Sequence, residues 1–331
     1  MKNKILNIVN ILLTGILAIL IMLYFITKVK NKENEKVSWT AEIRSFSENA
    51  ASKNTNIIKV IDGIFYNNFN HSTRTIDSDS RDLTSSESRE SIYFPTYEEL
   101  LPDSINLKYF SVDERKFYHL QTKIPYDLIR NAESKVANLT KLSLEILPKG
   151  KMVLKIDQED FPSIKIASYQ AKETTGDLEQ LIYKESLGEK YKDFEGLDSI
   201  NDFSDLLQNK YHWILTTDLE AGDHLMNANA YSFAEQQIYD VEEENLNVNE
   251  NIPKTFHVRF GNTDKYGIDY YFEANEILAA FRKLNENNGA EPILITFKIF
   301  KNKPAECKLS RNGQIISLKN TFPENPIKYA E

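Results

Sequence analysis

The sequence predicts an α+β fold, in which one N-terminal transmembrane helix precedes a mainly antiparallel β body with a few interspersed helices. Three observations support this prediction. Residues 5–27 form an apolar run without a charged residue. Segments with the alternation and the β-branched content of strands outnumber about four helical segments. These strand-like segments follow one another too closely for regular βαβ crossovers, which favours antiparallel pairing.

The apolar run 5–27 is long enough to cross a bilayer, because about 20 residues at ~1.5 Å rise each span a hydrocarbon core of ~30 Å. Lys2 and Lys4 supply the positive start of a signal sequence, but bulky residues stand where a small-residue cleavage site would lie. No cysteine stands near the run for lipid attachment. We therefore expect an uncleaved signal anchor, with residues 1–4 as a short tail and 28–36 as a charged linker. The alternative is a buried core helix.

Lysines flank the apolar run on both sides and give conflicting indications of orientation. Four lysines in 28–36 outnumber the two before the run, and a strict count would place the body in the cytoplasm. A tail of four residues before a signal-like run favours the opposite orientation. We expect a single-pass membrane protein with residues 37–331 outside the cytoplasm, on the periplasmic side of the inner membrane.

The body, residues 37–331, is acidic. Residues 1–36 hold six lysines and two glutamates, which leaves the body 34 basic and 47 acidic side chains and a net charge of −13. This charge argues against a nucleic-acid partner, which requires a basic patch. It suits plain solubility or a basic partner. Cys307 is the single cysteine, so no internal disulfide can form. The cysteine content therefore does not indicate the cellular compartment.

The first part of the body consists mainly of predicted strands. They cover residues 37–46, 57–69, 105–110, 116–122, 142–147, 152–156 and 164–169. Gly63 marks a bulge or bend in the second of them. Pro125 opens an amphipathic helix with the apolar stripe Leu128, Ile129, Ala132, Val136 and Leu139. Residues 70–91 are poor in apolar side chains and predict a long surface loop.

The pattern of predicted elements changes near 172–176, where we place a subdivision of the body. Short helices are expected at 178–183 and 200–207, and a longer one carries Ile277, Leu278, Phe281 and Leu284 inward. Strands are expected at 211–216, 255–260, 266–272, 293–300, 305–310 and 314–318. Asn312-Gly313 is the strongest hairpin turn. Residues 218–251 are acidic and Asn-rich and predict an irregular or disordered segment. The sequence shows no internal repeat and no glycine-rich phosphate loop.

The densest cluster of ligand-type side chains lies at 218–224. It comprises Asp218, Glu220, Asp223 and His224. Oxygen ligands at this spacing are suited to a hard cation such as calcium, although the order of an EF-hand loop is absent. The alternative is a solvated acidic loop.

Other candidate residues have simpler structural interpretations. Cys307 and His257 could act as nucleophile and base, but both lie in predicted strands, as does His119. Asp113-Glu114 fits a turn as well as a catalytic acid pair. Of the adjacent Tyr270 and Tyr271, we expect one in the core and the other exposed, where a tyrosine is a good interface anchor. We assign no catalytic, cofactor-binding or metal-binding residue.

The segment from Leu101 to Pro125 carries a recognisable set of positions. They are Leu101-Pro102, Tyr109 with Ser111, Glu114, Phe117-Tyr118 and Pro125. This pattern resembles the bacterial domain of unknown function family 2931. Further pieces follow the family's order, namely Trp39-Thr40-Ala41-Glu42 with Ile64-Phe65-Tyr66, and Ile146-Leu147-Pro148-Lys149-Gly150 with Ile166-Ala167-Ser168-Tyr169-Gln170-Ala171.

The resemblance covers residues 37–171 and implies display outside the cytoplasm, because many members of the family look like exported lipoproteins. This chain departs from them in having a membrane helix and no lipid-attachment cysteine. The family has no assigned activity, so the resemblance implies no site residue.

These observations predict a membrane-anchored envelope protein whose body is a non-catalytic binding module for a protein partner, such as an immunity-type partner of a secreted toxin. The alternative is an envelope hydrolase or metal-dependent enzyme with its site near 218–224. A third interpretation is a purely structural envelope component. The lipid bilayer is the expected partner of residues 5–27, and neither a cofactor nor a nucleic acid is expected.

Overall fold

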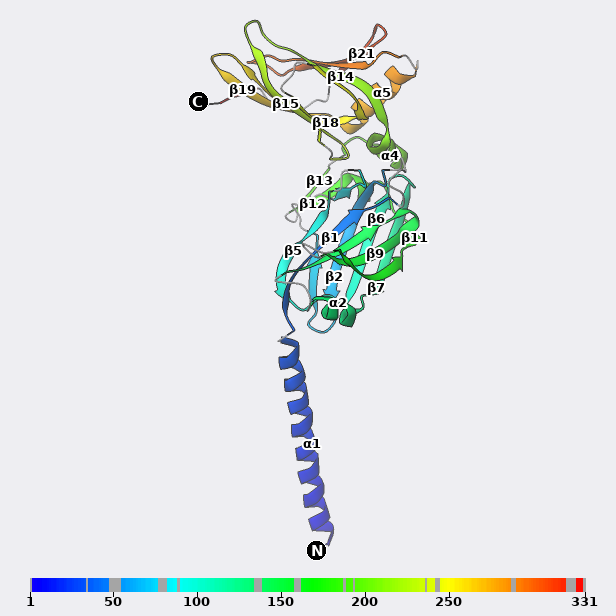
Figure 1. Ribbon diagram of the computed structural model, residues 1–331, viewed down its shortest axis with the longest axis vertical. Helices are drawn as coiled ribbons and strands as arrows, with labels where there is room; N and C mark the ends of the chain where they lie inside the picture. The colour runs from blue at the N-terminus through cyan, green and yellow to red at the C-terminus, as the bar shows by residue number, and fades with distance from the viewer. Residues whose placement is uncertain are drawn as a thin grey trace.

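Two β-sandwiches follow one another along the chain behind a long N-terminal helix, as Figure 1 shows. The computed structural model describes residues 2–33, 35–47, 55–76, 82–87, 90–133, 139–157, 162–186, 189–192, 194–235, 237–241, 245–286, 290–319 and 326–329. The fold is mostly β with few helices, and its four large sheets are antiparallel or mixed, as the sequence predicted.

The N-terminal helix α1 (Lys2–Glu33) extends away from the sandwiches (Figure 1). Its stretch Asn10–Thr27 is long and apolar enough to cross a membrane, and all its side chains are exposed. A core helix would bury such side chains, so the interpretation as a buried core helix is wrong. The exposed apolar surface fits a signal anchor or a signal peptide.

The first sandwich consists of two sheets around one apolar core. Sheet I has the order β10-β9-β8-β1-β5, with β1 (Val37–Ser45), β5 (Ile92–Glu99), β8 (Thr140–Ile146), β9 (Lys151–Asp157) and β10 (Ile164–Gln170). Sheet II has the order β11-β7-β6-β2-β3, with β2 (Ile58–Asn67), β3 (Ser72–Thr75), β6 (Ser104–Ser111), β7 (Lys116–Lys123) and β11 (Lys172–Thr174). The short β4 (Leu83–Thr84) pairs with β2, and helix α2 (Tyr126–Glu133) follows β7.

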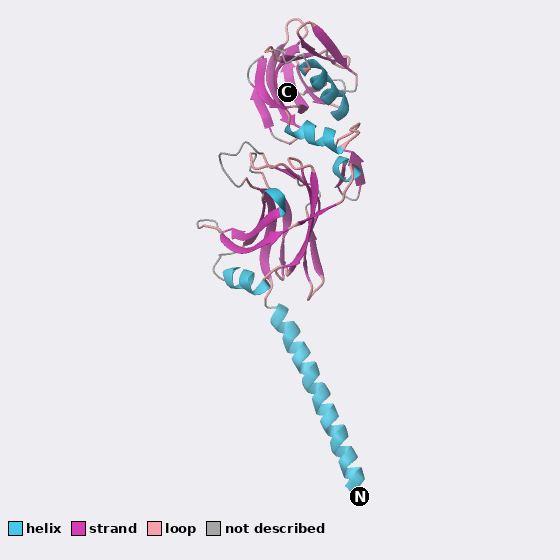
Figure 2. Cartoon of the chain, turned by 90° about the vertical axis from the view of Figure 1, so that its right-hand side faces the viewer, coloured by secondary structure: helices cyan, strands magenta, loops and turns pink. Residues whose placement is uncertain are grey.

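A connecting segment leads to the second sandwich. It contains α3 (Glu179–Ile182), β12 (Tyr183–Ser186), β13 (Glu189–Lys192) and α4 (Ile200–Gln208). Figure 2 shows α4 between the two sandwiches. Ser199 caps α4 by accepting a hydrogen bond from the backbone N–H of Asp202, which satisfies one of the free donors at the helix start.

The second sandwich has two further sheets and helix α5 (Ala274–Asn285). Sheet III has the order β17-β14-β20-β21-β22, with β14 (Lys210–Asp218), β17 (Asn245–Asn251), β20 (Ile293–Lys298), β21 (Glu306–Arg311) and β22 (Gln314–Leu318). Sheet IV has the order β16-β15-β18-β19-β23, with β15 (His224–Ser232), β16 (Gln237–Val241), β18 (Pro253–Gly261), β19 (Lys265–Tyr271) and β23 (Ile327–Tyr329).

Apart from the short β4, the described elements of the two sandwiches have the same topology. Sheets I and III each join one strand, β1 or β14, in parallel to a three-stranded antiparallel meander, and an edge strand, β5 or β17, pairs with its other side. Sheets II and IV are antiparallel throughout. They have the same strand order when sheet II is read from β3 and sheet IV from β16. Helices α2 and α5 occupy equivalent places before β8 and β20. The chain therefore contains an internal structural repeat, which the sequence analysis missed.

The equivalence extends to single residues. The two tryptophans of the chain, Trp39 and Trp213, each pair with the first residue of the parallel strand, and both are buried. The bulges in β2 and β15 fall at equivalent positions, five residues before Tyr66 and Tyr231 respectively. The bulge in β2 thus lies at Ile61, not at the predicted Gly63.

Stacked aromatic pairs also recur between equivalent strands. Tyr109 of β6 stacks on Tyr118 of β7 with ring centroids 5.3 Å apart. Phe260 of β18 stacks on Tyr266 of β19 with centroids 5.6 Å apart. Equivalent positions thus keep their size and apolar character while the residue identity changes, which explains why the repeat does not show in the sequence.

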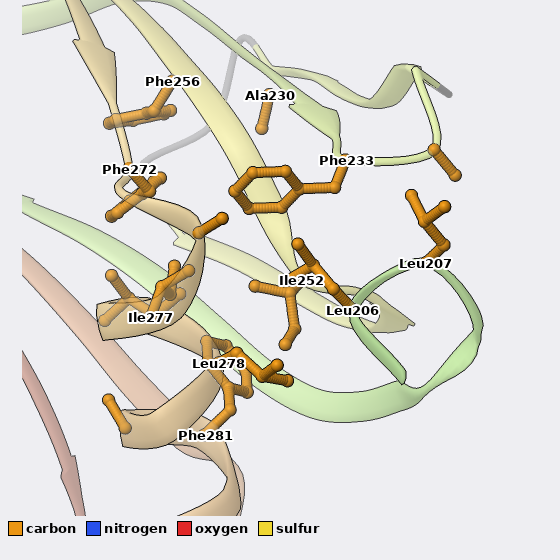
Figure 3. Close-up of a cluster of buried hydrophobic side chains, with 14 of the residues drawn as sticks. Leu206, Leu207, Ala230, Phe233, Ile252, Phe256, Phe272, Ile277, Leu278 and Phe281 are labelled. Atoms are coloured by element: carbon orange, nitrogen blue, oxygen red, sulfur yellow. The ribbon is translucent and has the colours of Figure 1, made fainter. Parts of the chain in front are cut away.

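A continuous apolar core joins the two sandwiches through the connecting segment. Phe110 of β6 contacts Phe203 of α4, with ring centroids 6.0 Å apart. Phe203 contacts Phe194 (4.9 Å), which in turn lies against Phe233 of the second sandwich (6.0 Å). Figure 3 shows where the α4 leucines, Leu206 and Leu207, approach the core of the second sandwich.

Charges reinforce the same junction. The carboxylate of Asp205 on α4 accepts from Arg115 of the first sandwich and from Arg282 of α5, each at 2.6 Å. Asp205 therefore bridges cations from both sandwiches.

Several expected elements differ from the structure. Residues 218–251 contain the strands β15, β16 and β17 instead of an irregular segment. The inward residues of β15 include Ala228 and Ala230, which are too small to produce a recognisable apolar alternation. Strands β3 and β4 fall within the expected loop 70–91. Leu128 of α2 is exposed, whereas Ile129 and Ala132 are buried as expected. Leu139 is exposed and lies outside α2, and Val136 lies outside the described residues.

Candidate interaction surface

The predicted 218–224 cluster is neutralised by lysines. The carboxylate of Asp223 forms an ion pair with Lys301 at 2.7 Å, and this hydrogen bond raises the pKa of the Lys301 ammonium. Glu220 accepts from the Lys301 backbone N–H at 3.4 Å, and Asp218 lies 4.0 Å from Lys298. Within the described ranges, no three His, Cys, Asp or Glu side chains are arranged to hold a metal ion. The cluster is explained by its ion pairs.

The side chains of Cys307 and His257 do not lie together. Cys307 lies in the apolar core of the second sandwich, where burial raises the pKa of its thiol. The neighbours of His257 on β18, Phe256 and Val258, point into that core, so His257 lies on the opposite, outer face of sheet IV. The structure therefore excludes a Cys–His pair in this conformation.

Asp113 and Glu114 lie in the turn between β6 and β7 and accept hydrogen bonds there. The backbone N–H of Ile57 donates to Asp113 at 2.7 Å, and desolvation raises the pKa of this carboxyl in spite of that bond. Glu114 accepts from the hydroxyl of Tyr118 and from the backbone N–H of Lys149. Both carboxylates thus have structural partners, in agreement with the turn interpretation. His119 contacts the side chain of Asn106 at 2.7 Å.

The outer face of sheet IV brings together aromatic and polar side chains that are far apart in the sequence. We call it the sheet IV face and define it by Asn227, Asn229, Tyr231, Thr255, His257, Arg259, Asp269, Tyr271 and Tyr329. The cross-strand register aligns Asn229, His257 and Asp269 in one row. Because strands lie about 4.8 Å apart, such a row forms a continuous surface.

The centre of the sheet IV face is a hydrogen-bonded row. Nδ1 of His257 lies 2.7 Å from the carboxylate of Asp269, and the ring of Tyr231 stands edge-on to the imidazole, 5.8 Å away. The side-chain oxygen of Asn229 is buried and has no donor among the residues that the structure describes. The hydrogen bond between His257 and Asp269 thus fixes the centre of the row.

One edge of the sheet IV face carries a cation close to an aromatic ring. Tyr329 of β23 lies over Gly267, where a Cβ would overlap its ring. The guanidinium of Arg259 lies 5.6 Å from the centroid of the same ring. Tyr329 and Tyr271 remain 46% and 47% exposed, so the face is open. The prediction that Tyr270 and Tyr271 divide between core and surface is confirmed, since Tyr270 is fully buried.

Sequence reasoning found Tyr271 and His257 but missed the surface that contains them. The contributing strands β15 and β23 were absent from the predicted elements. Only the register across four strands places Tyr231, Arg259 and Tyr329 together. The exposed tyrosine was the one signal of this surface in the sequence.

Comparisons of the chain with family models, with curated proteins and with solved structures found no match.

Proposed function

We propose that the protein is a membrane-anchored envelope protein whose body is a non-catalytic module for binding a protein partner. The exposed apolar helix α1 supports insertion into a bilayer, and the bulky residues where a cleavage site would lie support an uncleaved anchor. The positive start of the apolar run, with Lys2 and Lys4, supports a body outside the cytoplasm. An immunity-type role, in which the body neutralises a secreted toxin, fits these features.

The observation that carries the proposal is the sheet IV face. Tyrosine and arginine are enriched at the energetic centres of protein interfaces, and this face exposes Tyr271, Tyr329 and Arg259 on paired strands. The described candidates for chemistry, in contrast, are engaged in ion pairs or turn contacts. No observation favours the alternative of an enzyme with its site at 218–224.

Topology and binding can be tested in intact cells. Protease added to spheroplasts is expected to digest residues 37–331, and protection until lysis would contradict a body outside the cytoplasm. A photoreactive phenylalanine analogue at position 271 is expected to capture a protein. The same analogue at Tyr93 of sheet I or Ile315 of sheet III, both exposed, serves as the control. The absence of a protein adduct at every position would overturn the proposed function.

A further inference from the structure

The sheet IV face has an equivalent in the first sandwich, and the internal repeat makes the two directly comparable. Lys108 of β6 and Arg259 of β18 occupy the same position, since each pairs with the residue that follows the bulge, Asp62 or Asn227. Both also precede the stacked aromatic pair by one residue. A cation therefore stands at this position on both outer faces.

In the first sandwich the chain itself provides an acceptor for this cation. The ammonium of Lys108 donates to the side-chain oxygen of Gln180 on α3 at 3.0 Å. The neighbouring Phe117 packs into the apolar core that includes Leu181 of the same helix. An oxygen acceptor next to an apolar side chain thus covers the cation.

In the second sandwich the equivalent cation has no such cover. Arg259 is exposed and forms no ion pair within the part of the chain that the structure describes. Asp269, the acid among the residues that define the sheet IV face, is held by His257. An unpaired guanidinium is notable on a body with a net charge of −13, because acidic side chains are in excess there.

The geometry prepares Arg259 for a carboxylate. Its guanidinium lies 5.6 Å from the centroid of the Tyr329 ring, and that ring occupies the space that a side chain at Gly267 would fill. A guanidinium at this distance over an aromatic ring can still form a bidentate bond to a carboxylate through its donor edge. Ile327, on the adjacent edge strand β23, is exposed and offers an apolar surface to a segment bound at Arg259.

We propose that the sheet IV face binds a carboxylate-bearing segment of the partner protein, with Arg259 receiving the carboxylate and Tyr329 packing against the segment. This inference rests on the proposed function and adds the chemistry of the partner. The partner segment does for the second sandwich what α3 does for the first, supplying an oxygen acceptor and an apolar neighbour together.

Photo-crosslinking from position 327 in the full-length, membrane-inserted protein tests the proposal. The expected adduct is a protein whose crosslinked peptide contains Asp or Glu. Arg259→Gln is expected to lower the adduct yield at least tenfold, and Arg259→Lys to lower it less, because the charge remains without the bidentate geometry. Lys298→Gln, on the exposed face of sheet III, is the matched control and is expected to leave the yield unchanged.

Three results would overturn the inference. They are an unchanged yield for Arg259→Gln, a crosslinked peptide without an acidic residue, and a glycan or lipid in place of a protein. A protein adduct whose yield does not depend on Arg259 would contradict the inference and leave the proposed function intact. The absence of any protein adduct from positions 271, 327, 93 and 315 would contradict both the inference and the proposed function. The thermal midpoint of each variant shows whether it is folded. If Arg259→Gln is unstable, Tyr329→Ala removes the ring that packs against the segment and provides the second test, in which an unchanged yield again contradicts the proposal.

Discussion

Gly267 shows how one missing side chain shapes the candidate interaction surface. Its backbone lies beneath Tyr329, and a Cβ there would overlap the tyrosine ring. The side chain of Tyr329 is 46% exposed and helps to attach the edge strand β23 to β19. Overpacking at a partly exposed site costs less than in a core, so the effect of a substitution is modest and local.

We expect Gly267→Ala to lower the free energy of unfolding by about 1 kcal/mol, because the new methyl group displaces the Tyr329 ring. Urea denaturation measures this cost. The cost is expected to shrink in a Tyr329→Ala background, where no ring is present to be displaced. Equal costs in both backgrounds would show that the tyrosine is not the cause.

Cys307 occupies a core position of the second sandwich. Its equivalent in the first sandwich is Leu154, as the registers of β9 and β21 show, and both are buried. The thiol therefore fills space as a small apolar group. Burial raises its pKa, so the reactive thiolate is scarce at neutral pH.

We expect Cys307 to resist alkylation by iodoacetamide at pH 8 in the native protein and to react fully in denaturant. Mass spectrometry of the single-cysteine chain reports the modification directly. Rapid labelling of the native protein would contradict the assignment of this thiol to the core.

At the scale of elements, α4 acts as the connector between the sandwiches. Ser199 caps its first turn, and the Ser199 hydroxyl also donates to the carboxylate of Asp202. That hydrogen bond, followed by the bond from Arg282, lowers the pKa of Asp202. A carboxyl whose folded pKa is depressed stabilises the native state above its unfolded pKa, and this stabilisation is lost as the pH falls through the folded value.

We expect Ser199→Ala to cost about 1 kcal/mol at pH 7, which is the usual value of a helix cap. Below pH 4 the wild type loses stability as Asp202 becomes protonated. The variant is expected to lose less stability over this range, because its Asp202 has a less depressed pKa. Denaturation series at several pH values test both effects. An acid response identical to that of the wild type would contradict the role assigned to Ser199.

The exposed surface of sheet IV and the covered surface of sheet II illustrate what a repeat can reveal. Both faces carry a cation at the same position, Arg259 or Lys108. In one case a helix of the same chain packs nearby, and in the other the position is open. The difference lies in the connecting segment rather than in the sandwich.

At the scale of the whole molecule, the shared core couples the two sandwiches. Phe203 lies fully buried between Phe110 and Phe194. The charge bridge through Asp205 supports the same junction. The sandwiches are therefore expected to unfold together rather than independently.

The two tryptophans provide a direct test, because one lies in each sandwich. In Trp39→Phe and Trp213→Phe variants of the full-length protein in detergent, the remaining fluorescence reports on one sandwich, and the two urea transitions are expected to coincide. Phe203→Ala is expected to cost about 3–5 kcal/mol, as for other buried aromatic truncations, and to separate the transitions. Separate transitions in the parent protein would show that the junction does not couple them.

The sequence by itself determined the elements with strong local signals. The uncharged run 5–27, the apolar stripe of α5 and the turn at Asn312-Gly313 depend on residues close together in the chain. The helix and the turn formed where expected, and both turn residues have positive φ. Local periodicity and turn chemistry suffice for such elements.

Only the tertiary structure decided which strands pair and what their outer faces present. The parallel pairing of β1 with β8 joins segments about 100 residues apart, and it recurs between β14 and β20. Strand β15 carries alanines inward, so its place in sheet IV depends on its neighbours rather than on its own hydrophobicity. The internal repeat and the sheet IV face follow from that pairing, because a sheet assembles its surface from residues that are distant in the sequence.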